Sequence, residues 1–163
     1  MGPVAYFGLS LLGCLIFNPS LEGIGATSCR SGWMHYQQHC YGLFPEKVSW
    51  TDAEMECQHH RKGAHLATIL TPAEGNMVAR YISKSGFTDD VWIGLHDPNL
   101  NGHWMWTEGS RYRYKAWNAE EPNNTYEEYC VELVNHSDFK KWNDRKCEKE
   151  NAYLCKYELE RRK

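Results

Sequence analysis

The chain has 163 residues, of which 42% are hydrophobic and 24% charged, and 18 Lys and Arg stand against 21 Asp and Glu for a formal net charge of −3. This length suits one packed domain, and such a composition excludes a disordered chain or a polytopic membrane protein. A weakly negative chain also lacks the basic face that nucleic acid requires, so no nucleic-acid partner is expected.

Residues 1–26 are predicted to be a secretory signal peptide. The stretch 4–17 is almost wholly apolar, yet it is shorter than the roughly 20 residues that cross a bilayer. Small residues within 23–26 follow it and resemble a cleavage region. An uncleaved anchor or a buried helix is the alternative interpretation. We therefore expect a secreted, extracellular product without membrane insertion, whose mature domain spans 27–163.

Cleavage would remove Cys14, one of the seven cysteines, and leave an even number. An even number of cysteines in a short secreted chain favours three disulfides. The spacing alone leaves their connectivity open, and the absence of a CxxC pair argues against a cysteine-rich zinc site. The remaining cysteines are Cys29, Cys40, Cys57, Cys130, Cys147 and Cys155.

Two helices are predicted in the first half of the mature chain. The first follows Ser49, a plausible N-cap, and should stop at Gly63. The second opens at 71–74 with Thr-Pro-Ala-Glu, which supplies a cap, a proline at the first helical position and a glutamate at the third. A Ser-Gly pair at 85–86 should end it.

Short runs rich in β-branched and aromatic residues are predicted to be strands. The stretch 96–128 is rich in Asn, Gly, Pro and Glu and should form a long loop, and a loop of that length in a compact domain is usually functional. Two helices with many short strands indicate an α+β fold. The predicted strands are 40–44, 65–69, 91–95, 103–106, 129–134, 139–142 and 152–157.

Oxygen-bearing side chains gather in that loop and after it. Glu-Pro-Asn-Asn occupies 121–124, an acidic pair follows at 127–128, and Trp-Asn-Asp occupies 142–144. Carboxylate and amide oxygens suit Ca²⁺, which takes about 6–8 oxygen ligands, better than Mg²⁺. Each piece alone has an ordinary interpretation as a turn, a solvated acidic face or a turn cap. A calcium site is therefore a hypothesis, because these residue types alone do not distinguish it from ordinary turns and solvated acidic residues.

The mature chain resembles the C-type lectin domain family over essentially its whole length. The landmarks are the Cys29-x10-Cys40 spacing, the core motif Trp-Ile-Gly-Leu at 92–95, Glu-Pro-Asn at 121–123 and Trp-Asn-Asp-x2-Cys at 142–147. Further phrases are similar to the small secreted regenerating-protein group and to reptile venom lectins, and the sequence does not choose between them. The resemblance implies two helices, two small antiparallel sheets and a long calcium-binding loop.

The resemblance also implies a disulfide pairing, a calcium site and a cis peptide bond before Pro122, in the middle of that site. The implied pairs are Cys29–Cys40, Cys57–Cys155 and Cys130–Cys147. The implied calcium ligands are Glu121, Asn123, Glu128, Asn143 and Asp144, of which all except Asp144 would also contact the carbohydrate.

The order of Glu and Asn around Pro122 resembles mannose-type binders, which implies glycans bearing mannose, glucose, N-acetylglucosamine or fucose. One shallow site binds weakly, so several copies on one surface would be needed for avidity. No cysteine remains for an intermolecular bond, so any homo-oligomer should be noncovalent. The alternative function is a calcium-independent protein- or mineral-binding module on the same fold. No GxSxG or HExxH motif occurs, and an enzyme is not expected.

The sequence also raises two further questions, which concern glycosylation and a second calcium site. Asn135 heads an Asn-His-Ser sequon and is a better candidate for glycosylation than Asn123, where a glycan would remove a calcium ligand. A second calcium site occurs in some members of the family, but here asparagine replaces several of the usual acids. Its positions would be Asp97, Asn101, Asn124 and Tyr129, with Glu128 shared.

Overall fold

The structure is a computed structural model that describes residues 28–124 and 126–160. The predicted signal peptide, 1–26, lies outside these residues. Within them, no helix has both the length and the apolar character needed to span a membrane. The elements in chain order are β1 Met34–Tyr36, β2 His39–Val48, α1 Trp50–His60, β3 His65–Leu66, α2 Pro72–Lys84, β4 Val91–His96, β5 Met105–Trp106, β6 Cys130–Leu133, β7 Trp142–Arg145 and β8 Asn151–Glu158.

Both helices begin at the predicted caps. The side chain of Ser49 accepts a hydrogen bond from the backbone N–H of Asp52 at 3.2 Å, and the Thr71 hydroxyl accepts one from the N–H of Glu74 at 3.1 Å. These bonds satisfy donors that the first turn of a helix leaves unpaired. Helix α1 ends slightly before its predicted glycine stop, because Arg61 already has an extended backbone.

The strands form one hydrogen-bonded sheet in the order β1-β2-β8-β4-β6-β7, with β3 beside β8 and β5 beside β4. The α+β fold is confirmed, but the two small antiparallel sheets are joined into one network. A short parallel pairing of β4 with β8 makes the join, with Val91 opposite Ala152 and Trp92 opposite Tyr153. It can form because one end of β8 passes beside β4 while β8 stays paired with β2.

The strand predicted at 139–142 is wrong. Residues Asn135–Ser137 form a 3-10 helix, and Phe139 has a φ of 59°, in the left-handed region that a strand excludes. The strand instead occupies Trp142–Arg145 and pairs with β6. The correction matters for function, because it puts the Trp-Asn-Asp motif inside a regular strand.

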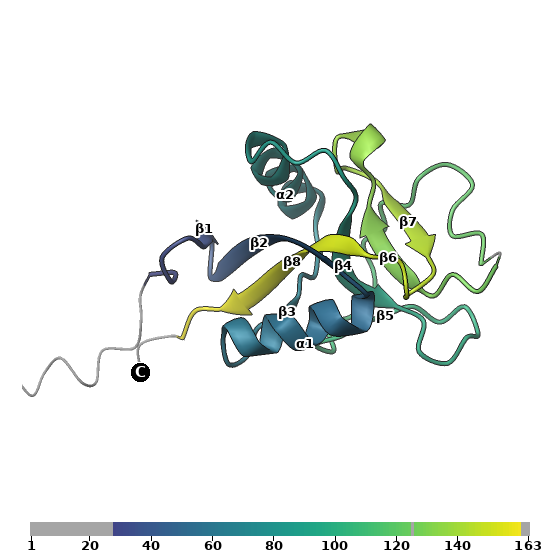
Figure 1. Cartoon of the computed structure of the whole chain (residues 1–163), viewed down its shortest axis with the longest axis horizontal. Coiled ribbons are helices and arrows are strands. Elements are labelled where there is room, and N and C mark those ends of the chain that lie inside the picture. The colour runs from purple at the N-terminus through teal and green to yellow at the C-terminus, as the bar shows by residue number, and fades with distance from the viewer. Residues whose placement is uncertain (1–27, 125, 161–163) are drawn as a thin grey trace, which may run out of the picture.

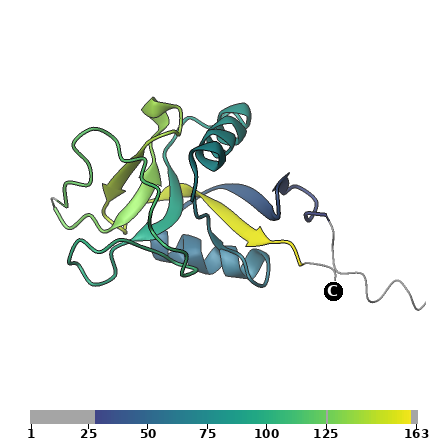
Figure 2. The same cartoon turned by 180° about the vertical axis from the view of Figure 1, so that it is seen from behind.

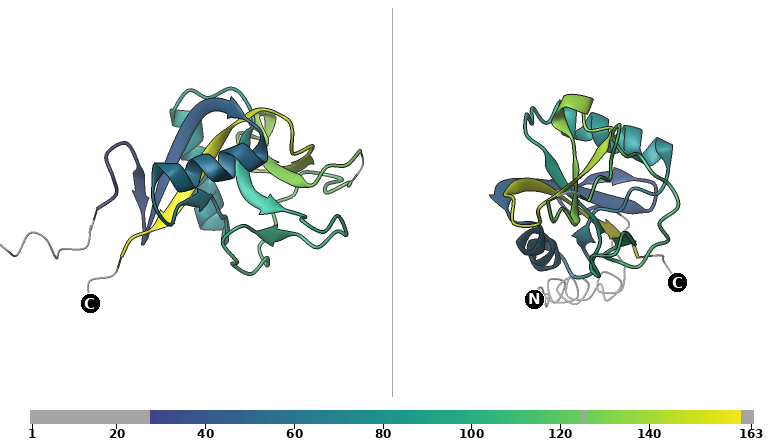
Figure 3. Two further views of the ribbon diagram at one scale, coloured as in Figure 1. Left: turned by 60° about the horizontal axis from the view of Figure 1, so that its bottom comes forward. Right: turned by 90° about the vertical axis from the view of Figure 1, so that its right-hand side faces the viewer.

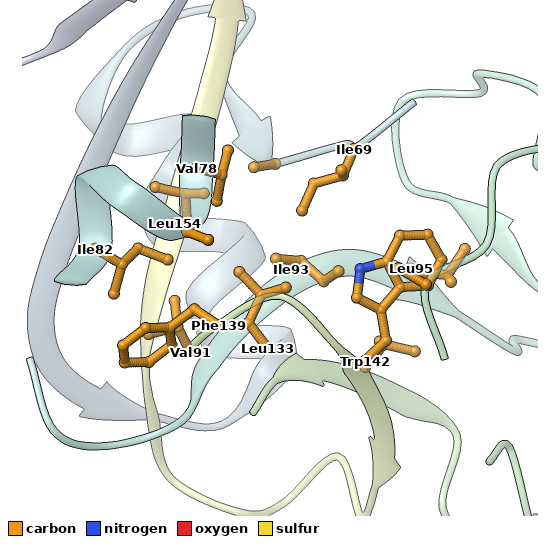
Figure 4. Close-up of a cluster of buried hydrophobic side chains, with 14 of the residues drawn as sticks. Ile69, Val78, Ile82, Val91, Ile93, Leu95, Leu133, Phe139, Trp142 and Leu154 are labelled. Atoms are coloured by element: carbon orange, nitrogen blue, oxygen red, sulfur yellow. The ribbon is translucent and has the colours of Figure 1, made fainter. Parts of the chain in front are cut away.

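The two helices cover opposite faces of the central strands, with α2 above and α1 below the β2–β8 pair in Figure 1 and again on opposite sides in Figure 3. Successive side chains of a strand point to opposite faces. In β4, Val91 and Ile93 therefore pack in the cluster that contains α2, whereas Trp92 packs in the cluster that contains α1. Figure 4 shows the larger cluster, where α2 meets β4, β6 and β8.

Three disulfides join the implied partners. They are Cys29–Cys40, Cys57–Cys155 and Cys130–Cys147, with sequence separations of 11, 98 and 17 residues. The second bond links α1 to β8 and so connects distant parts of the chain. The third links the start of β6 to the turn after β7, which fixes the two strands next to the long loop.

The long loop lies at the end of the molecule opposite to β1. The described chain begins and ends near β1 and the end of β8, whereas the connection from β5 to β6 extends past β7 at the other end (Figures 1 and 2). The predicted ligands are therefore gathered at one end of the domain, away from the termini of its described part.

Candidate functional site

Backbone hydrogen bonds hold the long loop against β7. The N–H of Asn118 donates to the carbonyl of Trp142 at 2.8 Å, and the N–H of Trp142 donates to the carbonyl of Ala116 at 2.8 Å. The rings of Trp117 and Trp142 pack with centroids 5.8 Å apart. This anchoring brings the Glu-Pro-Asn segment beside the strand that bears Asn143 and Asp144.

The peptide bond between Glu121 and Pro122 is cis, as the family resemblance implied. On the other side of the proline, the backbone N–H of Asn123 donates to Oε2 of Glu121 at 3.1 Å. The Asn123 side-chain Nδ2 donates to Oε1 of the same carboxylate at 3.2 Å. A carboxylate and an amide from the two sides of the proline therefore lie in direct contact.

Asp144 connects β7 to this loop. Its side chain is fully buried, and its Oδ1 accepts from the N–H of Asn123 at 3.4 Å while Oδ2 accepts from the N–H of Asn124 at 2.9 Å. A buried carboxylate is tolerated only when such donors surround it. Three of the five predicted ligands, Glu121, Asn123 and Asp144, thus meet at one place.

Negative charge accumulates among these carboxylates. Burial, then a hydrogen bond to Asp144 and the charge of Asp144, raise the pKa of Glu121 to about 7, although the N–H of Asn123 acts in the opposite direction. Burial and then the charge of Asp144 also raise the pKa of Glu128, against the opposing charge of Arg145. The charge of Asp144 therefore disfavours ionisation of both glutamates, which indicates that Glu128 lies within electrostatic reach of Asp144.

Asn143 is held differently from Glu121, Asn123 and Asp144. Adjacent residues of a strand project to opposite faces, and Asn143 uses its Nδ2 to donate to Oε1 of Glu132 at 3.3 Å. Its amide is thereby oriented by β6 rather than by the loop. The structure brings Glu121, Asn123 and Asp144 into contact, whereas the side-chain partner of Asn143 is Glu132 on β6.

That partner, Glu132, is a residue that the sequence analysis missed. It lies on β6, is 1% exposed, and accepts hydrogen bonds from Arg145 Nε at 2.9 Å, Lys149 Nζ at 2.8 Å and Asn151 Nδ2 at 2.7 Å. A lone glutamate inside the apolar run Cys-Val-Glu-Leu-Val was the available signal, because an unpaired charge is not found in a buried strand.

The donor chemistry of the loop suits a hard divalent cation. Glu121, Glu128 and Asp144 supply carboxylate oxygens and Asn123 an amide oxygen, which are ligands of the calcium type. A cation would also offset the negative charge of Asp144, which raises the pKa of both glutamates in addition to the larger effect of burial. Among the described residues, however, no three His, Cys, Asp or Glu side chains are grouped so as to hold a metal on their own. A complete set of ligands would therefore need the amide oxygens as well.

Asp97, the one acid specific to the possible second calcium site, binds backbone groups instead. Asp97 is 1% exposed, and its two oxygens accept from the N–H groups of Asn101 at 3.3 Å and Gly102 at 2.7 Å. Its own N–H donates to the carbonyl of Tyr129 at 2.8 Å. Asp97 thus organises the turn after β4, and we do not propose a second ion there.

The glycosylation candidate Asn135 is exposed at the start of the 3-10 helix. Its backbone N–H donates to Asp90 at 2.9 Å, and its side-chain Nδ2 donates to the carbonyl of Thr88. Nδ2 is the atom to which an N-linked glycan would attach. Modification of Asn135 would therefore replace the contact with Thr88.

The sequence matches the family described as the Lectin C-type domain over residues 46–157, a range that contains all five predicted ligands. It is 38% identical over 150 residues to regenerating islet-derived protein 4 of Homo sapiens, covering 91% of this chain and 94% of that protein. It is 40% identical over 147 residues to the C-type lectin lectoxin-Lei1 of Leioheterodon madagascariensis, covering 89% and 94%. The solved structure of human lithostathine superposes with a TM-score of 0.77 at 39% identity, covering 80% of this chain and 99% of that one.

Proposed function

The chain belongs to the C-type lectin domain family, and from this membership we propose that it is a secreted, calcium-dependent lectin for glycans of the mannose type. The observation that supports the proposal is the meeting of Glu121, Asn123 and Asp144 at the loop beside β7. Three disulfides are typical of a chain that folds in an oxidising, extracellular environment.

In the proposed site Glu121, Asn123, Glu128, Asn143 and Asp144 hold Ca²⁺. The ion, when bound, offers coordination positions to two neighbouring hydroxyls of a sugar. The carboxylates of Glu121 and Glu128 accept hydrogen bonds from those hydroxyls, and the amides of Asn123 and Asn143 donate to them. Glu132 keeps the Asn143 amide in one orientation, and the buried Asp144 keeps the loop in place.

The sugar preference follows from the order of acceptor and donor. Glu121 precedes Asn123 across the proline, and this order suits equatorial 3- and 4-hydroxyls. We therefore expect mannose, glucose, N-acetylglucosamine or fucose as the terminal unit. A single shallow site gives weak binding, so multivalent glycans or a noncovalent homo-oligomer would supply the avidity.

A second candidate function is a calcium-independent protein- or mineral-binding module on the same fold. It is favoured by the hydrogen bonds from Asn123 and Asn124 to Asp144, which close the loop using protein groups alone. It is also favoured by the absence, within the described residues, of a three-residue cluster of His, Cys, Asp or Glu. Fold alone does not decide between the two functions.

Retention on mannan-agarose, in calcium and then in EDTA, tests the proposal. We predict that Glu121→Gln weakens calcium-dependent retention at least about tenfold, since even partners that merely orient metal ligands are worth about 10–100-fold. The matched control is Glu120→Gln, which alters the neighbouring exposed carboxylate and should leave retention unchanged. Retention that persists in EDTA, or in the Glu121 variant, would favour the calcium-independent function.

A further inference from the structure

A groove of about 370 Å³ borders the candidate site. Its lining includes Glu128, a predicted calcium ligand, and the ring of Tyr126 from the same loop. The rest of the lining is cationic and comes from β7 and the turn after it. A saccharide bound through Glu128 would therefore have its neighbouring substituents or its next sugar unit at the mouth of this groove.

The three cations that line the groove differ in how many ion pairs and hydrogen bonds they form with the rest of the protein. Lys149 is paired with Asp90 at 2.9 Å and with Glu132 at 2.8 Å. Arg145 uses only its Nε, toward Glu132 at 2.9 Å, so that its two terminal nitrogens have no hydrogen-bond partner within the described chain. Lys146 is exposed, and its ammonium forms no ion pair with any described residue.

Two sets of donors, on Arg145 and Lys146, thus remain available in the lining of the groove. A guanidinium whose Nε is fixed by a buried carboxylate presents its terminal N–H groups in a set direction, a geometry that matches the oxygens of sulfate or carboxylate. Lys146 adds a second positive charge next to it in sequence. Both cations lie beside Glu128, whose charge would be neutralised when the proposed calcium ion is bound.

The groove is also lined by an aromatic side chain. Tyr126 is 78% exposed, so its ring is accessible to a ligand in the groove. An exposed tyrosine offers an apolar face to the C–H side of a sugar ring and a hydroxyl to its polar edge. A groove lined by both an aromatic ring and cations favours a ligand that is both a sugar and an anion.

We propose that this groove is a subsite for an acidic sugar unit, one that bears sulfate or carboxylate, in a glycan held at the calcium site. The proposal rests on the proposed lectin function and specifies its ligand class further. Arg145 and Lys146 bind the anionic group, Tyr126 packs against the ring, and Glu128 is common to the subsite and the calcium site. Lys149 stays paired with its two carboxylates and acts only by supporting the wall.

Three monosaccharides with the same equatorial 3- and 4-hydroxyls form a matched set of probes: glucose, glucuronic acid and glucose 6-sulfate. Each is used to inhibit retention of the full chain on mannan-agarose in calcium. The acidic sugars should inhibit at roughly three- to fivefold lower concentration than glucose at low salt, and this advantage should shrink as salt is raised, because partly exposed ion pairs are modest and screened. The ratio between the two acidic probes shows whether sulfate or carboxylate fits better.

Lys146→Gln isolates the subsite, because the altered side chain has no protein partner among the described residues to lose. The variant should lose the acidic advantage and keep its inhibition by glucose. Lys62→Gln is the control; Lys62 is an exposed lysine on a different surface, beside Arg61, Tyr157 and Glu158. If the control loses the advantage as well, overall charge rather than the groove is responsible, and the inference is overturned.

Failure of the subsite and failure of the lectin function give different results. Calcium-dependent retention that glucose and both acidic sugars inhibit equally would overturn the subsite and leave the proposed function standing. If the protein is not retained on mannan-agarose at all, titration of the isotope-labelled protein with glucose 6-sulfate still tests the subsite. Backbone NMR shifts at Tyr126, Arg145 and Lys146 that disappear in the Lys146 variant support the subsite, whereas no shifts, or equal shifts with inorganic sulfate, overturn it.

Discussion

Glu132 links stability and the candidate site through a single buried carboxylate. It is 1% exposed and receives four donors, from Asn143, Arg145, Lys149 and Asn151. Two of the donors are cations, so the charge is compensated in place. Because Asn143 is one of the four, any change at Glu132 should also reach the proposed calcium ligands.

Glu132→Gln tests this link. The neutral amide keeps the shape of the side chain but leaves Arg145 and Lys149 without their shared anion, and we expect a loss of about 1–3 kcal/mol in the free energy of unfolding. Both cations are partly exposed, which limits the loss. Urea unfolding measures it, and mannan retention should fall in parallel. In the matched control, Glu127→Gln, an exposed acid near the site, both quantities should stay at the wild-type value.

The pH dependence of calcium binding is the second prediction at the residue scale. Since the pKa of Glu121 is raised to about 7 in the free protein, protons should compete with calcium from neutral pH downward. The rise in Tm on adding calcium should therefore be smaller at about pH 5.5 than at about pH 7.5. Differential scanning fluorimetry at the two pH values measures the rise.

In the absence of calcium, raising the pH should lower the stability of the fold through Glu121, in contrast to its effect on calcium binding. A carboxyl whose pKa is higher in the folded protein than in the unfolded chain stabilises the fold below its unfolded pKa, and this contribution is lost as the pH rises through about 7. The calcium-free wild type should therefore lose stability between pH 5.5 and 7.5 relative to Glu121→Gln. An equal pH response in the two proteins would contradict this assignment.

At the scale of elements, the start of α2 combines two hydrogen bonds. The Thr71 hydroxyl accepts from the N–H of Glu74 at 3.1 Å, and Glu74 Oε2 accepts from the N–H of Leu70 at 2.8 Å. The other oxygen of Glu74 is bonded to the Tyr41 hydroxyl and to Lys156. The cap therefore joins α2 to β2 and β8.

Thr71→Ala removes the capping acceptor, and should cost about 1 kcal/mol of stability. The cap lies on α2, away from the loop ligands, so mannan retention should not change. Urea unfolding and retention are measured on the same preparation. Ser49→Ala, which removes the equivalent acceptor at α1, is the comparison and should cost a similar amount; a loss of retention in either variant would contradict the separation of the caps from the site.

At the scale of the whole molecule, the Cys57–Cys155 disulfide spans 98 residues and links α1 to β8. In the chain-entropy model the stabilisation grows with the length of the closed loop, to about 4–5 kcal/mol for one of this size and about 3 kcal/mol for one near 15 residues. Replacing both cysteines by alanine should therefore destabilise the protein more than the same change at Cys130–Cys147. Urea unfolding of the two double variants gives the order, and a reversed order would contradict the loop-length argument.

Local signals in the sequence were enough for the helices and most of the strands. Ser49 and Thr71 marked the starts of α1 and α2, because capping is a matter of a few neighbouring residues. The pattern at 139–142 failed because Phe139 is apolar for packing against the core, not for pairing in a strand. A residue pattern records burial but does not distinguish a buried loop residue from a strand residue.

The sequence alone determined the family and the α+β fold, since these follow from motifs and local patterns along the chain, whereas the disulfide partners were implied by the family resemblance and not by the cysteine spacing. Tertiary structure decided the rest. It brought Asp144 under the loop of Asn123, placed Asn143 against Glu132, and set Arg145 and Lys146 beside Tyr126. These contacts join residues that strand pairing and loop anchoring bring together across the chain, and no local pattern encodes the charge and hydrogen bonding that result.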